Sequence, residues 1–274
     1  MPLPCAAPVA HPVTVRPTTP DGGSAAQPAA VVTTTTIAPV APARRASVRS
    51  DIDVNVLCDA VTDPVDHPLA GVLRAAASGA FPPVDGLAEL LPPDAAGTCA
   101  VVSFTGHAYV LTELPSDALA DLALDGYGAA SHPRALLRLA GDGAIGSLDV
   151  VLVRPGAGGQ PTVTDRADLE HHPRVQRARH HRRHVRVLGD DRGFVTIGRG
   201  LVDRIEMSVE LLDHAHGNGA GRQLIDAGLC AISPSELVFA QVAPGNAASL
   251  RAFLACGFRP IGSEVLIEVS AAGT

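Results

Sequence analysis

The segment from His216 to Arg222 (HGNGAGR) carries glycine at alternate positions and precedes an expected helix. Glycine lets backbone N–H groups approach an anion without a Cβ in the way. A helix N-terminus adds about half a positive charge and unpaired N–H donors. The segment therefore predicts a cradle for a phosphate or pyrophosphate, with a tight strand-to-helix turn as the structural alternative.

Two glutamates on the preceding strand are candidate proton acceptors. Residues 204–212 alternate apolar with polar residues, so Glu206 and Glu210 share one face and Val209 and Leu211 share the other. A carboxylate beside a bound amine can act as a general base. A solvated strand face explains the same alternation, and the sequence leaves both interpretations open.

A second helix is expected from Asn246 to Cys256, with Asn246 as its N-cap after Pro244 and Gly245. It belongs to the pattern N-x-x-S-x-x-x-F-x-x-x-G-F, which contains Ser249 and Phe253. The order strand, glycine turn, helix, strand and this pattern resembles the Gcn5-related N-acetyltransferase (GNAT) superfamily over residues 182–270. Residues 168–187 are also similar to a branch of that superfamily from high-GC bacteria.

The resemblance implies an α/β (α+β) fold with a mixed, mostly antiparallel sheet and helices on both faces. It implies an acyl-CoA-dependent N-acyltransferase that moves an acetyl group from acetyl-CoA to an unidentified amine by direct attack. The strand backbone would pair with the pantetheine amides, the glycine turn would bind the pyrophosphate, and backbone N–H groups near Val209 would stabilise the oxyanion. The implied cofactor-binding residues are Val209, Leu211, His216, Gly217, Asn218, Gly219, Ala220, Gly221, Arg222, Asn246, Ser249 and Phe253, and the candidate catalytic residues are Glu206, Glu210 and Val209.

Two residues depart from the family pattern. His216 stands where the family usually has Arg or Gln, and Phe253 stands where many members carry a Tyr general acid. Phe has no proton to give to the leaving thiolate. The alternative function is therefore a non-catalytic acyl-CoA-binding or regulatory module.

Residues 171–186 are dense in Arg and His and predict a polar helix over about 173–183 that runs into a strand. A solvated basic face and an anion-attracting rim for a phosphorylated cofactor both fit. Adjacent histidines point in different directions on a helix, and the pair His180 and His184 straddles the expected helix end without an obvious carboxylate ligand. We therefore expect no metal.

The amino-acid composition excludes or disfavours several classes of function and site. The chain has no lysine, which excludes Schiff-base and Walker-type phosphate lysines. Its five cysteines are widely spaced, so neither a disulfide framework nor a zinc site is expected, and Cys230 and Cys256 are interpreted as core residues. The net charge of −7 disfavours a nucleic-acid partner. No membrane association is expected, and a cytoplasmic monomer or homodimer is the default.

The elements that must position these residues fall into three regions. Residues 1–50 are rich in Pro, Ala and Thr and predict a disordered tail. Residues 51–155 predict a smaller α/β region that shapes the acceptor pocket or is a degenerate second copy of the fold. Residues 156–274 predict the acetyltransferase domain. The expected strands are 99–104, 107–111, 147–153, 184–188, 194–197, 204–212, 237–242 and 265–269, and the expected helices are 68–80, 115–125, 132–141, 173–183, 219–231 and 246–256.

Overall fold

The computed structural model describes residues 67–212 and 218–269. The predicted tail at residues 1–50 lies outside the described residues, as do His216 and Gly217 of the glycine segment. Among the described residues, no helix has both the length and the apolar character that crossing a membrane requires.

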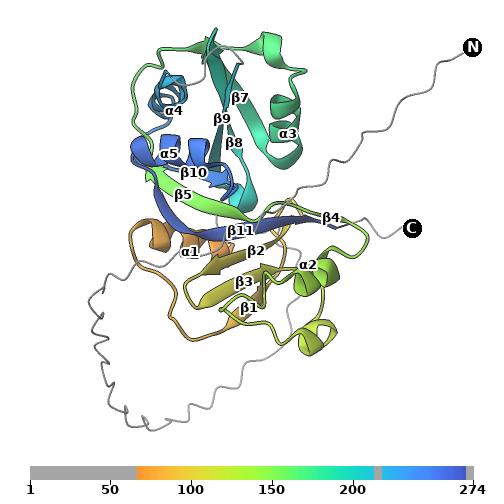
Figure 1. Cartoon of the computed structure of the whole chain (residues 1–274). Helices are drawn as coiled ribbons and strands as arrows, with labels where there is room; N and C mark the ends of the chain where they lie inside the picture. The colour runs from red at the N-terminus through yellow and green to blue at the C-terminus, as the bar shows by residue number, and fades with distance from the viewer. Residues whose placement is uncertain (1–66, 213–217, 270–274) are drawn as a thin grey trace, which may run out of the picture. The chain divides into compact units, whose positions relative to one another are not determined.

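Within the described residues, one sheet of 11 strands forms the centre of the fold (Figure 1). Its order is β1-β3-β2-β11-β5-β10-β9-β8-β7-β6, and β4 pairs with β11 beside this path. The pairs β1–β3 and β9–β10 are parallel, and the other pairs are antiparallel. The strands are β1 (Ala88–Leu91), β2 (Cys99–Phe104), β3 (His107–Leu111), β4 (Ala144–Ile145), β5 (Asp149–Pro155), β6 (Thr164–Asp165), β7 (Arg183–Asp190), β8 (Gly193–Arg199), β9 (Ile205–Leu211), β10 (Leu237–Val242) and β11 (Arg259–Glu268).

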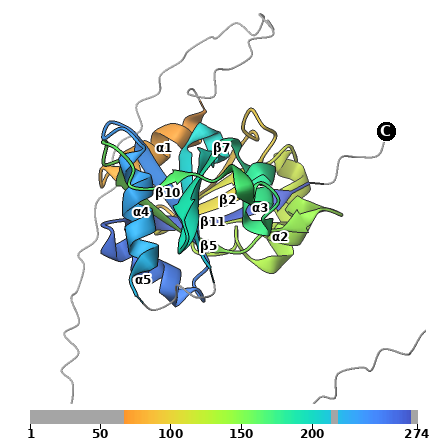
Figure 2. The same cartoon turned by 90° about the horizontal axis from the view of Figure 1, so that it is seen from above.

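Helices cover both faces of this sheet, as Figures 1 and 2 show from two directions. Leu69 of α1 and Val175 of α3 pack on one side, in clusters with Val153 and Phe194 respectively. On the other side, Leu224 of α4 packs with the alternate strand residues. The mixed, mostly antiparallel α/β architecture predicted from the sequence is therefore confirmed. The α-helices are α1 (Pro68–Ala77), α2 (Pro133–Ala140), α3 (Pro173–His181), α4 (Ala220–Cys230) and α5 (Ala247–Ala255).

Three of these helices begin with the same dipeptide, His-Pro. Proline fits the first helical position because its missing N–H would be unpaired there anyway. The preceding imidazole accepts a hydrogen bond from the backbone N–H two residues later, at 3.2 Å in each case. Each Nδ1 is thus an acceptor and the ring proton lies on Nε2. The capping histidines are His67, His132 and His172, so His172 has a structural role at the start of α3.

Most of the expected elements are present with small shifts of their ends, but residues 115–125 differ. They form a 3-10 helix, η2 (Ser116–Leu122), which ends where Ala123 takes a left-handed conformation. Strands β1, β4 and β6 were not expected, because runs of 2 to 4 residues are too short to show a periodicity. Strand β11 starts six residues before the expected strand, since a register shift at Pro260 accommodates the proline and Gly262.

Strands from both sides of residue 155 alternate across the centre of the sheet. Strand β5 lies between β10 and β11, and β11 lies between β5 and β2. The C-terminal strand therefore shares its two edges with strands from the N-terminal half. The division into functional regions at residues 155 and 156 stays a prediction.

Candidate functional site

Strand β10 is paired very differently on its two edges. Its antiparallel pairing with β5 covers six residues, from Leu237 to Val242. Its parallel pairing with β9 covers only Val238 with Ile205 and Phe239 with Glu206. Beyond these two positions the strands β9 and β10 separate, and the described residues form no further β9–β10 pairs along the gap.

A cavity of about 320 Å³ opens at this separation. Its walls come from β9, β10, α3, the start of α5 and the residues before β5. Five residues predicted for the site lie in this wall: Glu206, Val209, Asn246, Ser249 and Phe253. The structure therefore brings together the strand and the α5 parts of the predicted site. Leu211 and Glu210 lie farther along β9 and are outside this lining.

The predicted cap of α5 is confirmed. Asn246 Oδ1 accepts a hydrogen bond from the backbone N–H of Ser249 at 3.1 Å, while the Asn246 side chain also borders the cavity. Phe253 is 2% exposed and packs edge to face on Phe258, with the ring centroids 5.0 Å apart. It forms an apolar wall and brings no proton donor to the cavity.

The start of α4 carries the described part of the glycine segment. Gly219 has φ +75°, a conformation that favours glycine, and an added Cβ would meet no heavy atom within 4 Å. No side chain of the described residues caps this helix at Gly219. Asn218 and Arg222 are exposed, and Ala220 is buried. The first turn of α4 thus has backbone N–H groups that no side chain of the described residues caps.

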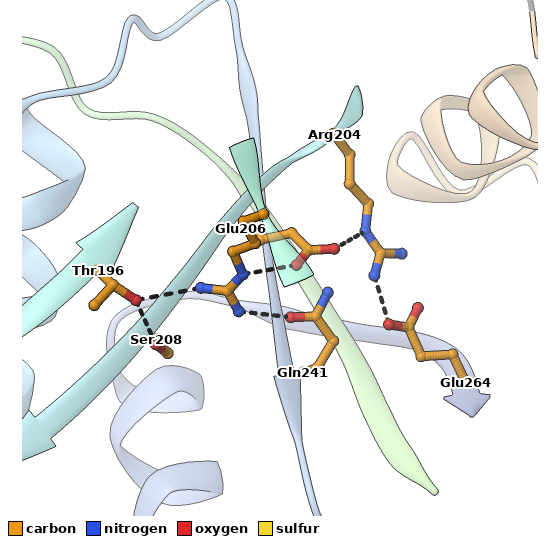
Figure 3. Close-up of polar contacts among 7 residues, drawn as sticks. Thr196, Arg204, Glu206, Ser208, Gln241 and Glu264 are labelled. Atoms are coloured by element: carbon orange, nitrogen blue, oxygen red, sulfur yellow. Dashed lines mark hydrogen bonds and ion pairs between the residues drawn. The ribbon is translucent and has the colours of Figure 1, made fainter. Parts of the chain in front are cut away.

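A buried ionic network lies on the cavity face of β9 (Figure 3). Arg204 Nε donates to Glu206 Oε1 at 2.9 Å, and Arg204 Nη2 donates to Glu264 Oε1 at 2.6 Å. Arg182 Nε donates to Glu206 Oε2 at 2.9 Å. Arg204, Glu206 and Glu264 are all less than a tenth exposed. Two guanidinium groups therefore hold the two carboxylates beneath the separated strands.

Arg182 reaches across the gap between the separated strands. Besides Glu206 on β9, it donates from Nη2 to Gln241 Oε1 on β10 at 3.4 Å and from Nη1 to Thr196 Oγ1 on β8 at 3.3 Å. The Thr196 hydroxyl in turn lies 2.6 Å from that of Ser208. In Figure 3 the Thr196 and Ser208 side chains lie together, and Gln241 lies on the other side of the guanidinium group that contacts both Thr196 and Gln241. The Arg182 side chain therefore bridges β9 and β10 at the point where the backbone pairing between these strands ends.

The two predicted carboxylates have different environments. Burial alone would raise the pKa of Glu206, but Arg204 and Arg182 hold it below its ordinary value. Glu206 therefore keeps its negative charge and anchors the two arginines, and the strand face is not solvated at this position. Glu210 is partly exposed and accepts from Arg174 Nε at 2.8 Å.

Sequence reasoning missed two titratable groups of the cavity, Asp149 and His181. Burial raises the pKa of Asp149, against the lowering effects of the Ser147 hydroxyl, which donates to it at 2.8 Å, and of Arg177. Burial lowers the pKa of His181, and the nearby Arg177 and His180 lower it further. Asp149 is the one charged residue of the expected strand 147–153, and that is the only signal in the sequence.

The arginine-rich segment is largely neutralised by carboxylates from other elements. Arg174, Arg179, Arg182, Arg183 and Arg186 each form an ion pair with an acidic residue. Arg177 forms none with the described residues, and it borders the cavity. A uniformly solvated basic face is therefore wrong for Arg182, whose side chain is only 11% exposed.

The expectation about the histidine pairs also needs correction. His180 and His181 both approach Glu268 at the end of β11, with Nε2 to Oε1 distances of 3.1 and 3.8 Å. The ligand atoms of these three residues lie within 4.8 Å of one another. A carboxylate partner was not evident from the sequence because Glu268 is 88 residues from His180. His184 adopts φ 52° outside α3, so it does not pair with His180 on a helix.

Cys256 is unsuited to nucleophilic chemistry. Burial raises the pKa of the Cys256 thiol to about 12, with a further contribution from Asp226. Cys256 packs in the core cluster that includes Phe253 and Leu224. It is a small core residue, as predicted.

No family model matches this chain, and no curated protein matches its sequence. A solved structure from Novosphingobium aromaticivorans DSM 12444, named as a candidate acetyltransferase of the GNAT family, is similar to part of it. The two share 15% sequence identity with a TM-score of 0.33. The similarity covers 47% of this chain and 69% of the other. A likeness of this extent does not assign the chain to a family.

Proposed function

We propose that this protein is an acyl-CoA-dependent N-acyltransferase that moves an acetyl group from acetyl-CoA to an amine. The observation that carries the proposal is the separation of β9 from β10 after two paired residues, with a cavity at the gap. A pantetheine arm has amide groups that can pair with an open strand edge in the way that an added strand does. The glycine turn at the start of α4 would then hold the pyrophosphate.

The proposal gives each part of the cavity a task. The unpaired backbone of Val209 and Leu211 binds the pantetheine amides, and the Val209 N–H polarises the thioester carbonyl. Asn246 and Ser249 flank the arm from α5. The amine attacks the carbonyl carbon directly, so no covalent enzyme intermediate and no catalytic triad are needed. Because acetyl-CoA is a cytoplasmic metabolite, the proposal places the protein in the cytoplasm. A monomer or a homodimer stays the prediction for its oligomeric state.

The attacking amine needs a group that accepts its proton. Glu206 and Glu210 were the sequence candidates. Two arginines hold Glu206 ionised, so it has little tendency to take a proton. Glu210 is already paired with Arg174 and lies outside the cavity lining. We assign Glu206 to positioning Arg182, and we retain Glu210 as a candidate that Arg174 weakens.

Thermal unfolding of the full chain with and without about 1 mM acetyl-CoA tests the proposal. For a dissociation constant near 10 μM, the ligand adds about 2.7 kcal/mol to the stability, a shift of several degrees. Gly219→Glu should abolish the shift because it places a negative charge at the pyrophosphate cradle. Gly219→Ala is the matched control, since it carries the same backbone strain without the charge and there is space for its Cβ. No shift with acetyl-CoA, CoA or longer acyl-CoAs would overturn the proposal.

The second candidate is a non-catalytic acyl-CoA-binding or regulatory module. It is favoured by Phe253, which supplies no proton to a leaving thiolate, and by the ion-paired state of Glu206. It predicts the same thermal shift with acetyl-CoA. Release of free CoA thiol in the presence of an amine separates the two, because only the enzyme releases it faster than the uncatalysed reaction.

A further inference from the structure

A second cavity, of about 300 Å³, adjoins the first. The two cavities have five lining residues in common, among them Asp149, Arg177 and His181. The second cavity extends away from the strand gap, along residues 144–147 and the end of β11. A molecule lying in it can therefore reach the first cavity past Asp149. Neither the glycine segment nor α5 contributes to its lining, so the predicted donor site does not use it.

The wall of the second cavity is acidic. Three carboxylates line it, those of Asp149, Glu264 and Glu268, together with the guanidinium of Arg177 and the imidazole of His181. Glu264 is paired with Arg204, which lies outside this lining. Because the pKa of His181 lies below its ordinary value, this imidazole is largely neutral at pH 7 and adds little positive charge beside Glu268, whose Oε1 the His180 Nε2 also approaches at 3.1 Å. Burial raises the pKa of Asp149, and the nearby Arg177 lowers it without reversing that direction. The balance of charge in this cavity is negative.

Glu264 gives an independent indication of a missing donor. It is 2% exposed and its Oε1 is bonded to Arg204, but its Oε2 accepts no hydrogen bond from the described residues. A buried carboxylate oxygen without a donor is rare, because leaving such an atom unsatisfied is costly. Burial raises the pKa of Glu264, and the nearby charges of Glu206 and Asp149 raise it further. A cation entering the cavity would relieve this crowding of negative charge.

We propose that the second cavity is the acceptor subsite and that it takes a short alkyl diamine. One amino group lies at Asp149, at the junction with the first cavity, and the second ammonium group lies at the acidic end near Glu268. Asp149 is the catalytic base, and Glu268 sets the preference for a second positive charge. This inference rests on the proposed function, because it supplies the acceptor for the same acyl transfer.

In the proposed reaction the acceptor amine loses two protons and the thioester loses its thiol. The acceptor enters as an ammonium ion and gives one proton to the Asp149 carboxylate, which frees the nitrogen lone pair. The nitrogen bonds to the thioester carbonyl carbon, and the carbon–sulfur bond then breaks with its electron pair on sulfur. The second nitrogen proton passes to this thiolate, and Asp149 returns its proton to solvent. The products are the amide, CoA thiol and one released proton.

Three acceptors with four carbon atoms each test the charge preference: 1,4-diaminobutane, 1-aminobutane and 4-aminobutanoate. They differ only in the far group, which is positive, neutral or negative. We expect the diamine to have a kcat/KM at least about tenfold above that of 1-aminobutane, with 4-aminobutanoate the poorest, measured by thiol release from acetyl-CoA. Equal values for the first two, or a preference for 4-aminobutanoate through Arg177, would overturn the proposal.

Two variants assign the roles. Glu268→Gln should raise KM for the diamine about tenfold with little change in kcat, and should leave 1-aminobutane unaffected. Its matched control is Glu236→Gln, a similarly exposed glutamate that pairs with Arg199 away from both cavities. Asp149→Asn should lower kcat about a hundredfold for both amines. Unchanged kcat in this variant would remove the base role.

A binding measurement keeps this proposal separable from the proposed function. Thermal unfolding with 10 mM 1,4-diaminobutane, without acetyl-CoA, should show stabilisation that 1-aminobutane does not give and that Glu268→Gln removes. Failure of acetyl-CoA to bind would refute the acyltransferase and leave this readout to decide on the cation site. Binding of acetyl-CoA without stabilisation by the diamine, and without a charge preference in turnover, would refute the acceptor subsite alone.

Discussion

The two edges of β10 form different kinds of sheet. The edge toward β5 is a continuous antiparallel ladder whose central residues, such as Leu152 and Ala240, are fully buried and apolar. Along the edge toward β9 the backbone pairing ends after two residue pairs, so this edge is open. The guanidinium of Arg182 crosses the gap between Glu206 and Gln241. One edge is held by main-chain hydrogen bonds and packing. The other is held by buried charges, which leave backbone free for a ligand.

This difference between the two edges of β10 explains why so many charged residues are buried beneath the gap between β9 and β10. Separating two adjacent strands in a core exposes main-chain groups that need partners. The network of Arg204, Glu206, Glu264 and Arg182 provides a rigid polar support beneath the gap, and each ion in it depends on the others because charges are costly to bury alone. The open edge is therefore expected to respond to charge changes, and the closed edge to changes of volume.

The largest effect is expected from Arg204→Ala, which leaves Glu264 without its cation and removes one of the two from Glu206. Removing one partner of a buried pair costs about 3–5 kcal/mol. Urea unfolding of the full chain should show this loss. Arg199→Ala is the matched control, since Arg199 is partly exposed and its pair with Glu236 contributes only about 0–1 kcal/mol.

A double variant sharpens this result. Arg204→Met combined with Glu264→Leu removes the cation and one anion together, while Glu206 keeps Arg182. Replacing a buried ion pair with apolar residues of similar size is often neutral, so most of the lost stability should return. If the double variant is as unstable as Arg204→Ala, the shape of this network matters more than its charge.

The next effect is expected on the closed edge, from Leu152→Ala. Leu152 is 0% exposed and packs in the cluster that α4 and α5 share with the sheet. The cavity left behind should cost about 3 kcal/mol. The dissociation constant for acetyl-CoA, measured where the variant is folded, should stay within about twofold of the unmodified protein. A large loss of affinity would mean that the two edges of β10 are not independent.

The sequence predicted the strands on either side of the gap, but it did not predict their order in the sheet. Alternation of apolar and polar residues gave β9, and an apolar run bounded by turn residues gave β10, because both signals are local. Neither signal contains the sheet order that places β5 on one side of β10 and β9 on the other. Arg182 crosses the gap between β9 and β10. The sequence predicted only a solvated basic face or an anion-attracting rim for its segment, because its partner Glu206 is distant along the chain.

The candidate site divides in the same way. Val209, Asn246 and Ser249 were candidates because the resemblance implied their roles, and the strand alternation and the helix cap that place them are local signals. Asp149, His181 and Gln241 have no such motif, and they enter the cavity only through tertiary packing. Glu268 reaches His180 and His181 across the fold, which no periodicity reports. Groups that approach one another through distant elements are the part of a site that a single sequence hides.

The smallest effect on stability is expected from Asp149→Asn, and its sign is the informative quantity. Burial raises the pKa of Asp149 above its ordinary value of 3.8, so the folded protein favours the protonated form. The stability due to this group is fully present below pH 3.8 and is lost as the pH rises through the folded pKa. At pH 7 the ionised carboxylate therefore opposes folding, and an uncharged Asn should increase the free energy of unfolding.

Urea unfolding between pH 4 and pH 8 measures this difference. The advantage of Asp149→Asn should grow from near zero at pH 4 toward a plateau at neutral pH, while Asp165→Asn, at an exposed position, should show no such trend. A variant that gains stability and loses turnover identifies a charge that is retained for function against the interest of the fold. A loss of stability at pH 7 would instead mean that Asp149 is retained for its hydrogen bond with Ser147, and the base at the junction of the two cavities would have to be His181.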